Sequence, residues 1–218
     1  MMCFGLFKRK KITEADLRRP GGMKVGITAF GSPRRFKILE GISEAQDFIE
    51  NNSKLKIDIT FVQESNNLPA EEIQPYNNTP RYMVWPESLS SNSKGKMPTD
   101  MKTNIVLYDT QDRVPIWGGG LALGFRNPPH ISIPYNNNNY WDEGWKTSLA
   151  PTLVHELTHC FYDLLKTKRI AGSENLPKID QADTIHYTDE ATDPGWIIFR
   201  KWCLEKITQE MADALMED

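Results

Sequence analysis

Hydrophobic and polar residues alternate along three segments of this chain, and this period of two predicts β-strands. The three segments are Met23–Phe30, Leu55–Val62 and Asn104–Tyr108. Two shorter apolar runs, Leu121–Phe125 and His130–Ile133, are separated by turn residues and are expected to pair as antiparallel strands. The strands therefore begin near the N-terminus and extend to the middle of the chain.

Three other segments have hydrophobic residues at steps of three and four, which predicts amphipathic helices. They are residues 32–51, residues 149–165 and Trp196–Met216. The core positions expected in the last helix are Ile197, Trp202, Ile207 and Met211. Strands and helices together predict an α+β protein with a small twisted sheet.

The remaining segments have the composition of loops. Residues 64–102 are rich in Asn, Pro, Ser and Lys and are expected to form a long excursion with a short strand around Tyr82–Trp85. Residues 1–22 are expected to be a flexible basic leader, and residues 23–218 a single domain. Within it, a C-terminal sub-domain is expected from about residue 166, beginning with the connecting segment 167–195.

Composition narrows the class of protein. The chain has 218 residues, of which 39% are hydrophobic and 25% charged, as in ordinary globular domains. A net charge of −3 argues against a nucleic-acid partner, because phosphate binding needs clustered Lys and Arg. No run approaches the roughly 18 apolar residues of a membrane span. Three widely spaced cysteines and no visible signal peptide favour a cytoplasmic location, whereas the sequence is silent on oligomeric state.

The pentad His155-Glu156-Leu157-Thr158-His159 lies in the second predicted helix. Residues four apart lie on one face of a helix, so both imidazoles can bind one Zn²⁺. Glu156 is adjacent to the first ligand and within reach of a water molecule on the metal. This H-E-x-x-H arrangement is typical of zinc-dependent hydrolases.

The pentad and the order of helix, strands, edge strand and H-E-x-x-H helix resemble the zincin superfamily of metallopeptidases. The resemblance implies a zincin-like α+β fold, with the sheet packed on the N-terminal helix and the motif helix and followed by a C-terminal helix. It also implies a peptide or protein substrate, bound as an added strand along the sheet edge. Leu121–Phe125 and His130–Ile133 are both open as that edge strand.

A catalytic zinc site needs a third protein ligand. The metzincin extension of the motif would place His at position 165, where this chain has Leu165, so the ligand is expected further downstream. His186 is preferred because it is the only His after the motif. The alternatives are Glu190, which gluzincins would favour, Glu174, Asp183, Asp189 and the upstream His130.

The resemblance also implies roles for other residues. Glu156 would be the general base, and Tyr187 or Tyr162 would stabilise the oxyanion. Asp163 or Asp183 would orient a ligand imidazole, whereas Cys160 is expected to be a small core residue.

Two other classes of function compete with a zinc peptidase. A deformylase-like amidase would need an upstream Cys ligand, and none lies between Cys3 and Cys160. A non-catalytic structural or interaction protein with a zincin fold, of viral or mobile-element type, would bind zinc without turnover. The presence of Glu156 favours activity over that alternative.

Overall fold

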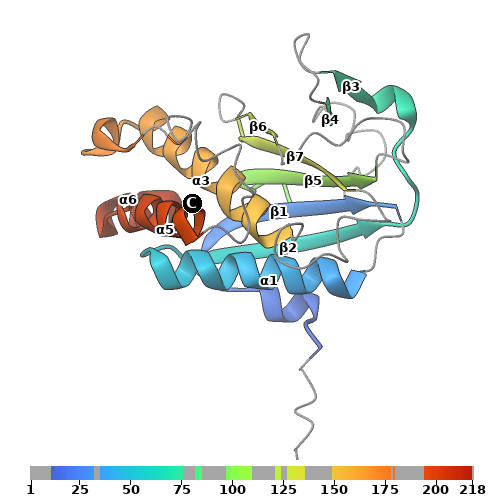
Figure 1. Ribbon diagram of the computed structural model, residues 1–218, viewed down its shortest axis with the longest axis horizontal. Helices are drawn as coiled ribbons and strands as arrows, with labels where there is room; N and C mark the ends of the chain where they lie inside the picture. The colour runs from blue at the N-terminus through green and yellow to red at the C-terminus, as the bar shows by residue number, and fades with distance from the viewer. Residues whose placement is uncertain are drawn as a thin grey trace, which may run out of the picture.

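The computed structural model describes residues 11–31, 35–75, 82–84, 97–109, 121–123, 127–135, 149–177, 179 and 194–217. Figure 1 shows the elements, and their order along the chain is η1 (Glu14–Leu17), β1 (Met23–Phe30), α1 (Arg35–Asn52), β2 (Ile57–Glu64), η2 (Ala70–Glu72), β3 (Ile73–Pro75), β4 (Tyr82–Val84), β5 (Thr103–Asp109), β6 (Leu121–Leu123), β7 (His130–Tyr135), α3 (Leu149–Thr167), η4 (Ser173–Asn175), α5 (Pro194–Glu205) and α6 (Gln209–Met216). The protein is α+β, as the sequence predicts.

The central sheet has five strands in the order β2-β1-β5-β7-β6. The first four are parallel to one another, and β6 pairs antiparallel with β7 at the edge. The expected antiparallel pair is therefore confirmed, and β6 rather than β7 is the edge strand. The strands β1, β2 and β5 match the three predicted segments to within two residues at each end.

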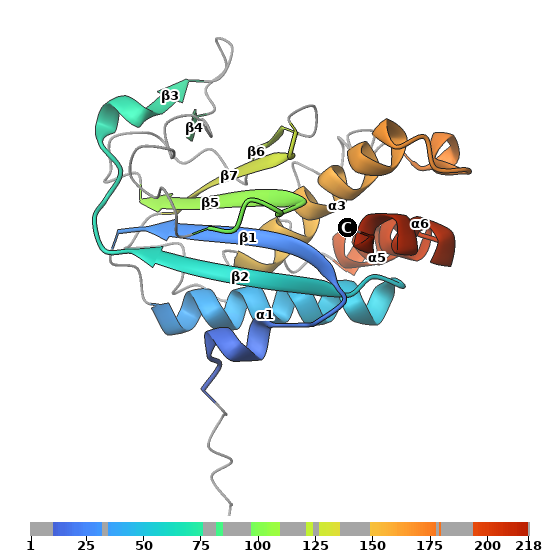
Figure 2. The same cartoon turned by 180° about the vertical axis from the view of Figure 1, so that it is seen from behind.

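One face of the sheet carries the main hydrophobic core. Figures 1 and 2 show α3 crossing this face, and α1 and α3 contact each other. Gly41 of α1 permits their close approach, because a Cβ atom there would lie 3.0 Å from the Cβ of Leu149. Buried side chains from β1, β5 and β7, such as Ile27, Ile105 and Ile131, complete this core.

The opposite face carries a smaller cluster made of Phe30, Leu68, Val84, Val106 and Tyr108. Alternation along a strand explains the separation, because successive side chains of β5 point to opposite faces. The residues that cover this face come from the 64–102 excursion, in which β3 and β4 form an antiparallel hairpin. Strand β4 was expected from the sequence, whereas β3 was not.

Two side chains of β7 bind the backbone of β4. Val84 donates its N–H to Ser132 Oγ at 2.9 Å, and its carbonyl oxygen lies 2.8 Å from His130 Nε2. His130 and Ser132 are both buried. Two main-chain groups of the short hairpin are thereby paired inside the protein, where leaving them unpaired would be costly.

The second half of the predicted leader, residues 11–22, packs on the domain. Leu17 of η1 is fully buried in the main core. Arg18 donates two hydrogen bonds to Asp58 of β2, at 2.7 and 2.8 Å. Gln46 of α1 donates to the carbonyl oxygens of both Leu17 and Ile57. Residues 1–10 of the leader lie outside the described residues.

The sequence predicts one helix over Trp196–Met216. This prediction is wrong in one respect, because the structure has two helices there, α5 and α6. Thr208 begins α6 as its N-cap, since its Oγ1 accepts a hydrogen bond from the N–H of Met211. Ile207 and Met211 are buried as expected, but Trp202 is 41% exposed and lies beneath the ammonium group of Lys206. The side chain of Ile197 lies outside the described residues.

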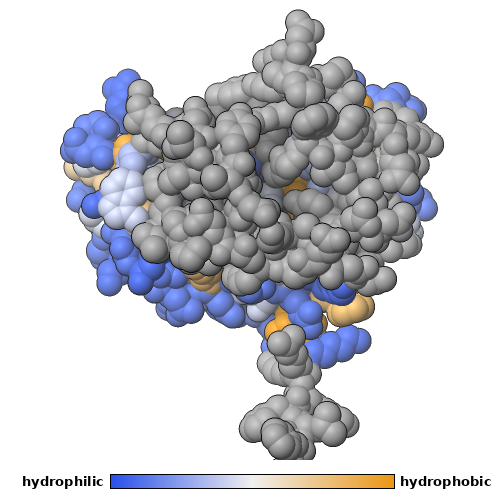
Figure 3. Space-filling model, viewed as in Figure 1, coloured by the Kyte–Doolittle hydropathy of each residue, from blue (hydrophilic) through white to orange (hydrophobic). Residues whose placement is uncertain are grey.

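The described surface in Figure 3 is mainly hydrophilic, with small separate hydrophobic areas. Its large exposed hydrophobic side chains, within the described residues, are Phe36 and Trp202. Among the helices of that part of the chain, none is long and apolar enough to span a membrane.

Candidate metal centre

Helix α3 carries the motif and is held by its apolar side. Its first turn includes Pro151, a position where the missing N–H breaks no hydrogen bond. The buried apolar side chains that fix the helix on the sheet and on α1 are Leu149, Leu153, Val154, Leu157, Cys160, Phe161 and Leu165. Helix α3 also contacts β6 and β7, so the motif helix and the edge strand belong to one packing unit.

The imidazoles of His155 and His159 converge. Their Nε2 atoms lie 3.2 Å apart, with ring centroids 4.7 Å apart and ring planes at 82°. Both side chains are half-buried, and their separation of four residues places them one turn apart on α3. The sequence predicted this pairing, and the structure brings the two residues together.

The pair fits two ligand positions of a zinc ion. In a tetrahedral site with Zn–N bonds of 2.0–2.1 Å, two ligand nitrogens are about 3.3 Å apart. The 3.2 Å separation of the two Nε2 atoms is close to this value, and it is also the distance of a hydrogen bond between the two imidazoles. Within the described ranges, however, no third His, Cys, Asp or Glu joins the two imidazoles as a metal-binding group.

Glu156 and Thr158 lie between the two histidines in the sequence and are both buried. The hydroxyl of Thr158 makes its hydrogen bond within the helix, because Oγ1 donates to the carbonyl oxygen of Val154 at 2.6 Å. Glu156 is 5% exposed, which is unusual for a carboxylate.

The preferred third ligand and its main alternatives lie outside the described residues. These are His186, Glu190, Asp183 and Asp189, and the proposed oxyanion donor Tyr187 belongs to the same segment. Of the remaining alternatives, Glu174 is exposed on η4, where Asn175 donates a hydrogen bond to it. His130 is buried against Val84 on the face of the sheet that carries the smaller cluster. Neither belongs to a metal-binding group with the pair.

The sequence left Tyr162 open as a donor to the oxyanion, but its hydroxyl is already bound elsewhere. Its side chain is 2% exposed, and its hydroxyl donates to the carbonyl oxygen of Cys203 in α5 at 2.7 Å. Burial and the neighbouring Cys203 raise the pKa of the phenol well above its ordinary value, so it stays protonated. The sequence offered no sign of this contact, which joins residues 41 positions apart.

Cys160 is a core residue, as expected. It is fully buried, and burial, followed by the negative charges of Glu156 and Asp163, raises the pKa of its thiol well above the ordinary value. A protonated buried thiol is neither a nucleophile nor a metal ligand. Asp163 itself is half-buried on α3, and its role in orienting an imidazole stays a prediction.

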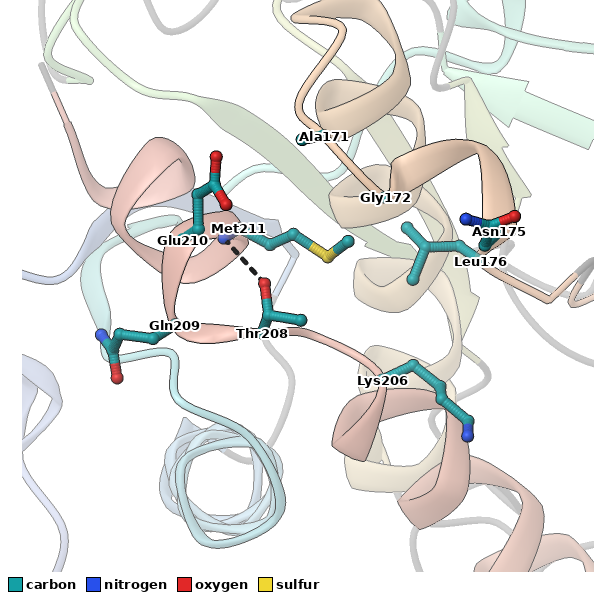
Figure 4. A pocket seen from close by; sticks show the side chains of 9 residues that line it. All are labelled: Ala171, Gly172, Asn175, Leu176, Lys206, Thr208, Gln209, Glu210 and Met211. Carbon is teal, nitrogen blue, oxygen red and sulfur yellow. Dashed lines mark hydrogen bonds between the residues drawn. The ribbon is translucent and has the colours of Figure 1, made fainter.

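A groove of about 460 Å³ lies between η4 and the start of α6, away from the motif. Figure 4 shows Met211 and Leu176 facing each other across it, with Lys206 and Glu210 nearer its ends. Its lining residues are Ala171, Gly172, Asn175, Leu176, Lys206, Thr208, Gln209, Glu210 and Met211. None of the motif residues belongs to it, so this groove is separate from the candidate metal centre.

No protein-family model matches this chain, and no curated protein or solved structure matches it either. The functional argument therefore depends on the motif, the geometry of the two imidazoles and the surrounding packing.

Proposed function

We propose that this protein is a zinc-dependent peptidase with a zincin-like fold. The observation that carries the proposal is the 3.2 Å separation of the His155 and His159 Nε2 atoms on a helix that also carries the buried Glu156. Two imidazoles at the spacing of metal ligands and a buried carboxylate on the same helix are components that metal-assisted hydrolysis uses. His186 is proposed as the third ligand, which leaves one coordination position for water.

When bound, zinc would supply a polarising charge that makes water a nucleophile near neutral pH. His155 and His159 would hold the metal through their imidazoles. Glu156 accepts the proton of the attacking water and delivers it to the leaving amine. The hydroxyl of Tyr187 is proposed to donate to the oxyanion, because the hydroxyl of Tyr162 is bound to Cys203.

The proposed substrate is a peptide or protein segment in extended conformation. Within the described residues β6 is the outermost strand of the sheet and contacts α3, and an outermost strand is where an added peptide strand would pair. This placement agrees with the zincin resemblance, in which the substrate lies along the edge strand above the metal. A cytoplasmic location is part of the same proposal.

Metal-dependent cleavage tests the function. Protein loaded with one equivalent of zinc should cleave members of a mixed peptide library, and a chelator should abolish cleavage until zinc is restored. Full zinc binding without cleavage would favour the alternative, a zinc-binding structural or interaction protein. Failure to bind zinc would contradict both functions.

A further inference from the structure

Within the described residues, β2 is the outermost strand on the side of the sheet away from β6. The N–H of Met23 in β1 binds the carbonyl oxygen of Lys56, so Lys56 and every second residue after it direct their backbone groups toward β1. The intervening residues direct their N–H and C=O groups away from the sheet, and they are Ile57, Ile59, Phe61 and Gln63.

Side chains of α1 bind the first of these outward backbone groups. The N–H of Ile57 donates to Glu50 Oε1 at 3.1 Å, and its carbonyl oxygen accepts from Gln46 Nε2 at 2.6 Å. Among the described residues, no such partner binds the outward backbone groups of Ile59 and Phe61. An unpaired strand edge of β-branched and aromatic residues is a template on which another strand can pair.

Residues 12–19, which we call the edge strap, lie over this edge. Their 3-10 helix η1 contacts both β2 and α1, and Figures 1 and 2 show it in blue next to α1, on the side of the sheet where β2 lies. Leu17 is fully buried, and Gln46 donates to its carbonyl oxygen as well as to that of Ile57. No backbone–backbone hydrogen bond joins the strap to β2 within the described part of the chain. The strap therefore covers the edge without extending the sheet.

Ion pairs hold the strap at both ends of the edge. At one end Arg18 donates two hydrogen bonds to Asp58, at 2.7 and 2.8 Å. At the other end Glu14 pairs with Arg35, which also donates to Gln63 Oε1 at 2.9 Å. The strap thus spans the part of β2 whose outward backbone groups have no partner.

We propose that the edge strap keeps β2 from pairing with another chain, and that its release lets β2 pair with β2 of a second copy. The pairing is antiparallel, because a two-fold axis brings the same edge of both copies together. Release removes Arg18 from Asp58 and Glu14 from Arg35, at opposite ends of the edge. Antiparallel pairing places the Asp58 end of each copy beside the Arg35 end of the other, so the released charges are complementary.

The test is the self-association of a strap-released variant, Leu17→Ser combined with Arg18→Ala, measured by sedimentation velocity against wild type at equal concentration. The apparent affinity follows the fraction of molecules whose edge is open, so it should rise about tenfold or more. Amide hydrogen exchange gives a second readout. The N–H groups of Ile59 and Phe61 should exchange more slowly in the associated variant than in wild type, because pairing gives them hydrogen-bond partners.

Leu215→Ser is the matched control. Leu215 is a leucine of α6 buried in the same core as Leu17, so its replacement also removes buried apolar area, but outside the strap. It should lower the denaturation midpoint without strengthening self-association. Arg18→Ala alone keeps Leu17 in the core and should produce a smaller change in the direction of the double variant, including where the double variant fails to fold.

Gln63→Pro tests whether the β2 edge itself forms the contact. Proline removes an outward N–H and no hydrogen bond to β1, since the backbone groups of Gln63 point away from β1. Added to the released variant, it should return self-association to the wild-type level. Self-association that is unchanged by strap release, or that Leu215→Ser strengthens equally, would overturn the proposal. Association that persists with Gln63→Pro would also overturn it, because the copies would then meet through another surface.

Discussion

The Nε2 atoms of His155 and His159 lie 3.2 Å apart, at the separation that two ligands of one tetrahedral zinc ion require. The helix that carries them is fixed by its apolar side chains, so the packing of α3 sets the positions from which the two rings converge. The side of α3 that faces the core is buried, as the side chains of Leu153, Leu157 and Phe161 show. Zinc binding should therefore require little rearrangement of this helix.

Removing either imidazole should remove the zinc. His155→Ala and His159→Ala should each lower zinc affinity by at least two orders of magnitude, because each variant loses one of the three proposed protein ligands. Metal content after dialysis, measured by atomic absorption, checks this. His130→Gln is the control, since His130 binds Val84 rather than the pair and its loss should leave about one zinc per chain. Equal zinc in all three variants would contradict the site.

The third ligand is tested by a pair of substitutions in the segment before α5. His186→Ala should weaken zinc binding strongly, whereas Glu190→Ala should have a small effect. Isothermal titration with zinc against both variants separates the two residues. The reverse order of effects would assign the site to the branch of zincins that uses a glutamate ligand.

Asp58 should make stability depend on pH. Hydrogen bonds from Arg18 are the main cause that lowers the pKa of this carboxyl below its ordinary value of 3.8. A carboxyl with a lowered folded-state pKa contributes stability that is fully present above 3.8 and is lost as the pH falls toward the folded value. Asp58→Asn should therefore lower the free energy of unfolding by roughly 1–2 kcal/mol at neutral pH, and by progressively less below about pH 4.

Urea titrations at several pH values measure this difference. Asp100→Asn is the control, because the Asp100–Lys24 ion pair is exposed and its removal should have no measurable effect on stability. The free energies of unfolding of wild type and Asp58→Asn could instead differ by the same amount from pH 7 to pH 3. That result would show that the Arg18 contact does not act through the charge of Asp58.

The break between α5 and α6 predicts a local capping effect. Thr208→Ala removes the N-cap oxygen that accepts from Met211 and should cost about 0.5–1 kcal/mol of stability, whereas Thr208→Ser should retain most of it. Thermal melts of the two variants compare the losses. Equal losses would indicate that the methyl group of Thr208, rather than its oxygen, is important.

The sequence predicts most elements whose pattern is regular. Alternation along Val25, Ile27 and Ala29 predicts β1, and the spacing of Leu149, Leu153 and Leu157 predicts α3 with its buried side. The histidine pair follows from its spacing of four alone. These features depend on residues that are close to one another in the chain, within about one helical turn or one strand. A single sequence therefore reveals them.

Features that depend on distant contacts could not be predicted. Leu17 is buried by packing against elements that follow it in the chain, so a basic, glycine-bounded leader gave no sign of it. Near the end of α5, the carbonyl oxygen of Cys203 binds Tyr162, 41 positions earlier in the chain, and the apolar periodicity continued across the break that follows. Trp202 was expected in the core because of that same periodicity, but it is 41% exposed.

The most direct test of the central claim is the peptidase turnover of Glu156→Gln with zinc content measured on the same sample. Glutamine keeps the size of the buried side chain but cannot accept the proton. Zinc should remain at about one per chain, while turnover should fall by a factor on the order of 10² or more, as expected for loss of a general base. Turnover equal to that of wild type, with zinc fully bound, would contradict the assignment of Glu156 and of the hydrolytic mechanism built on it.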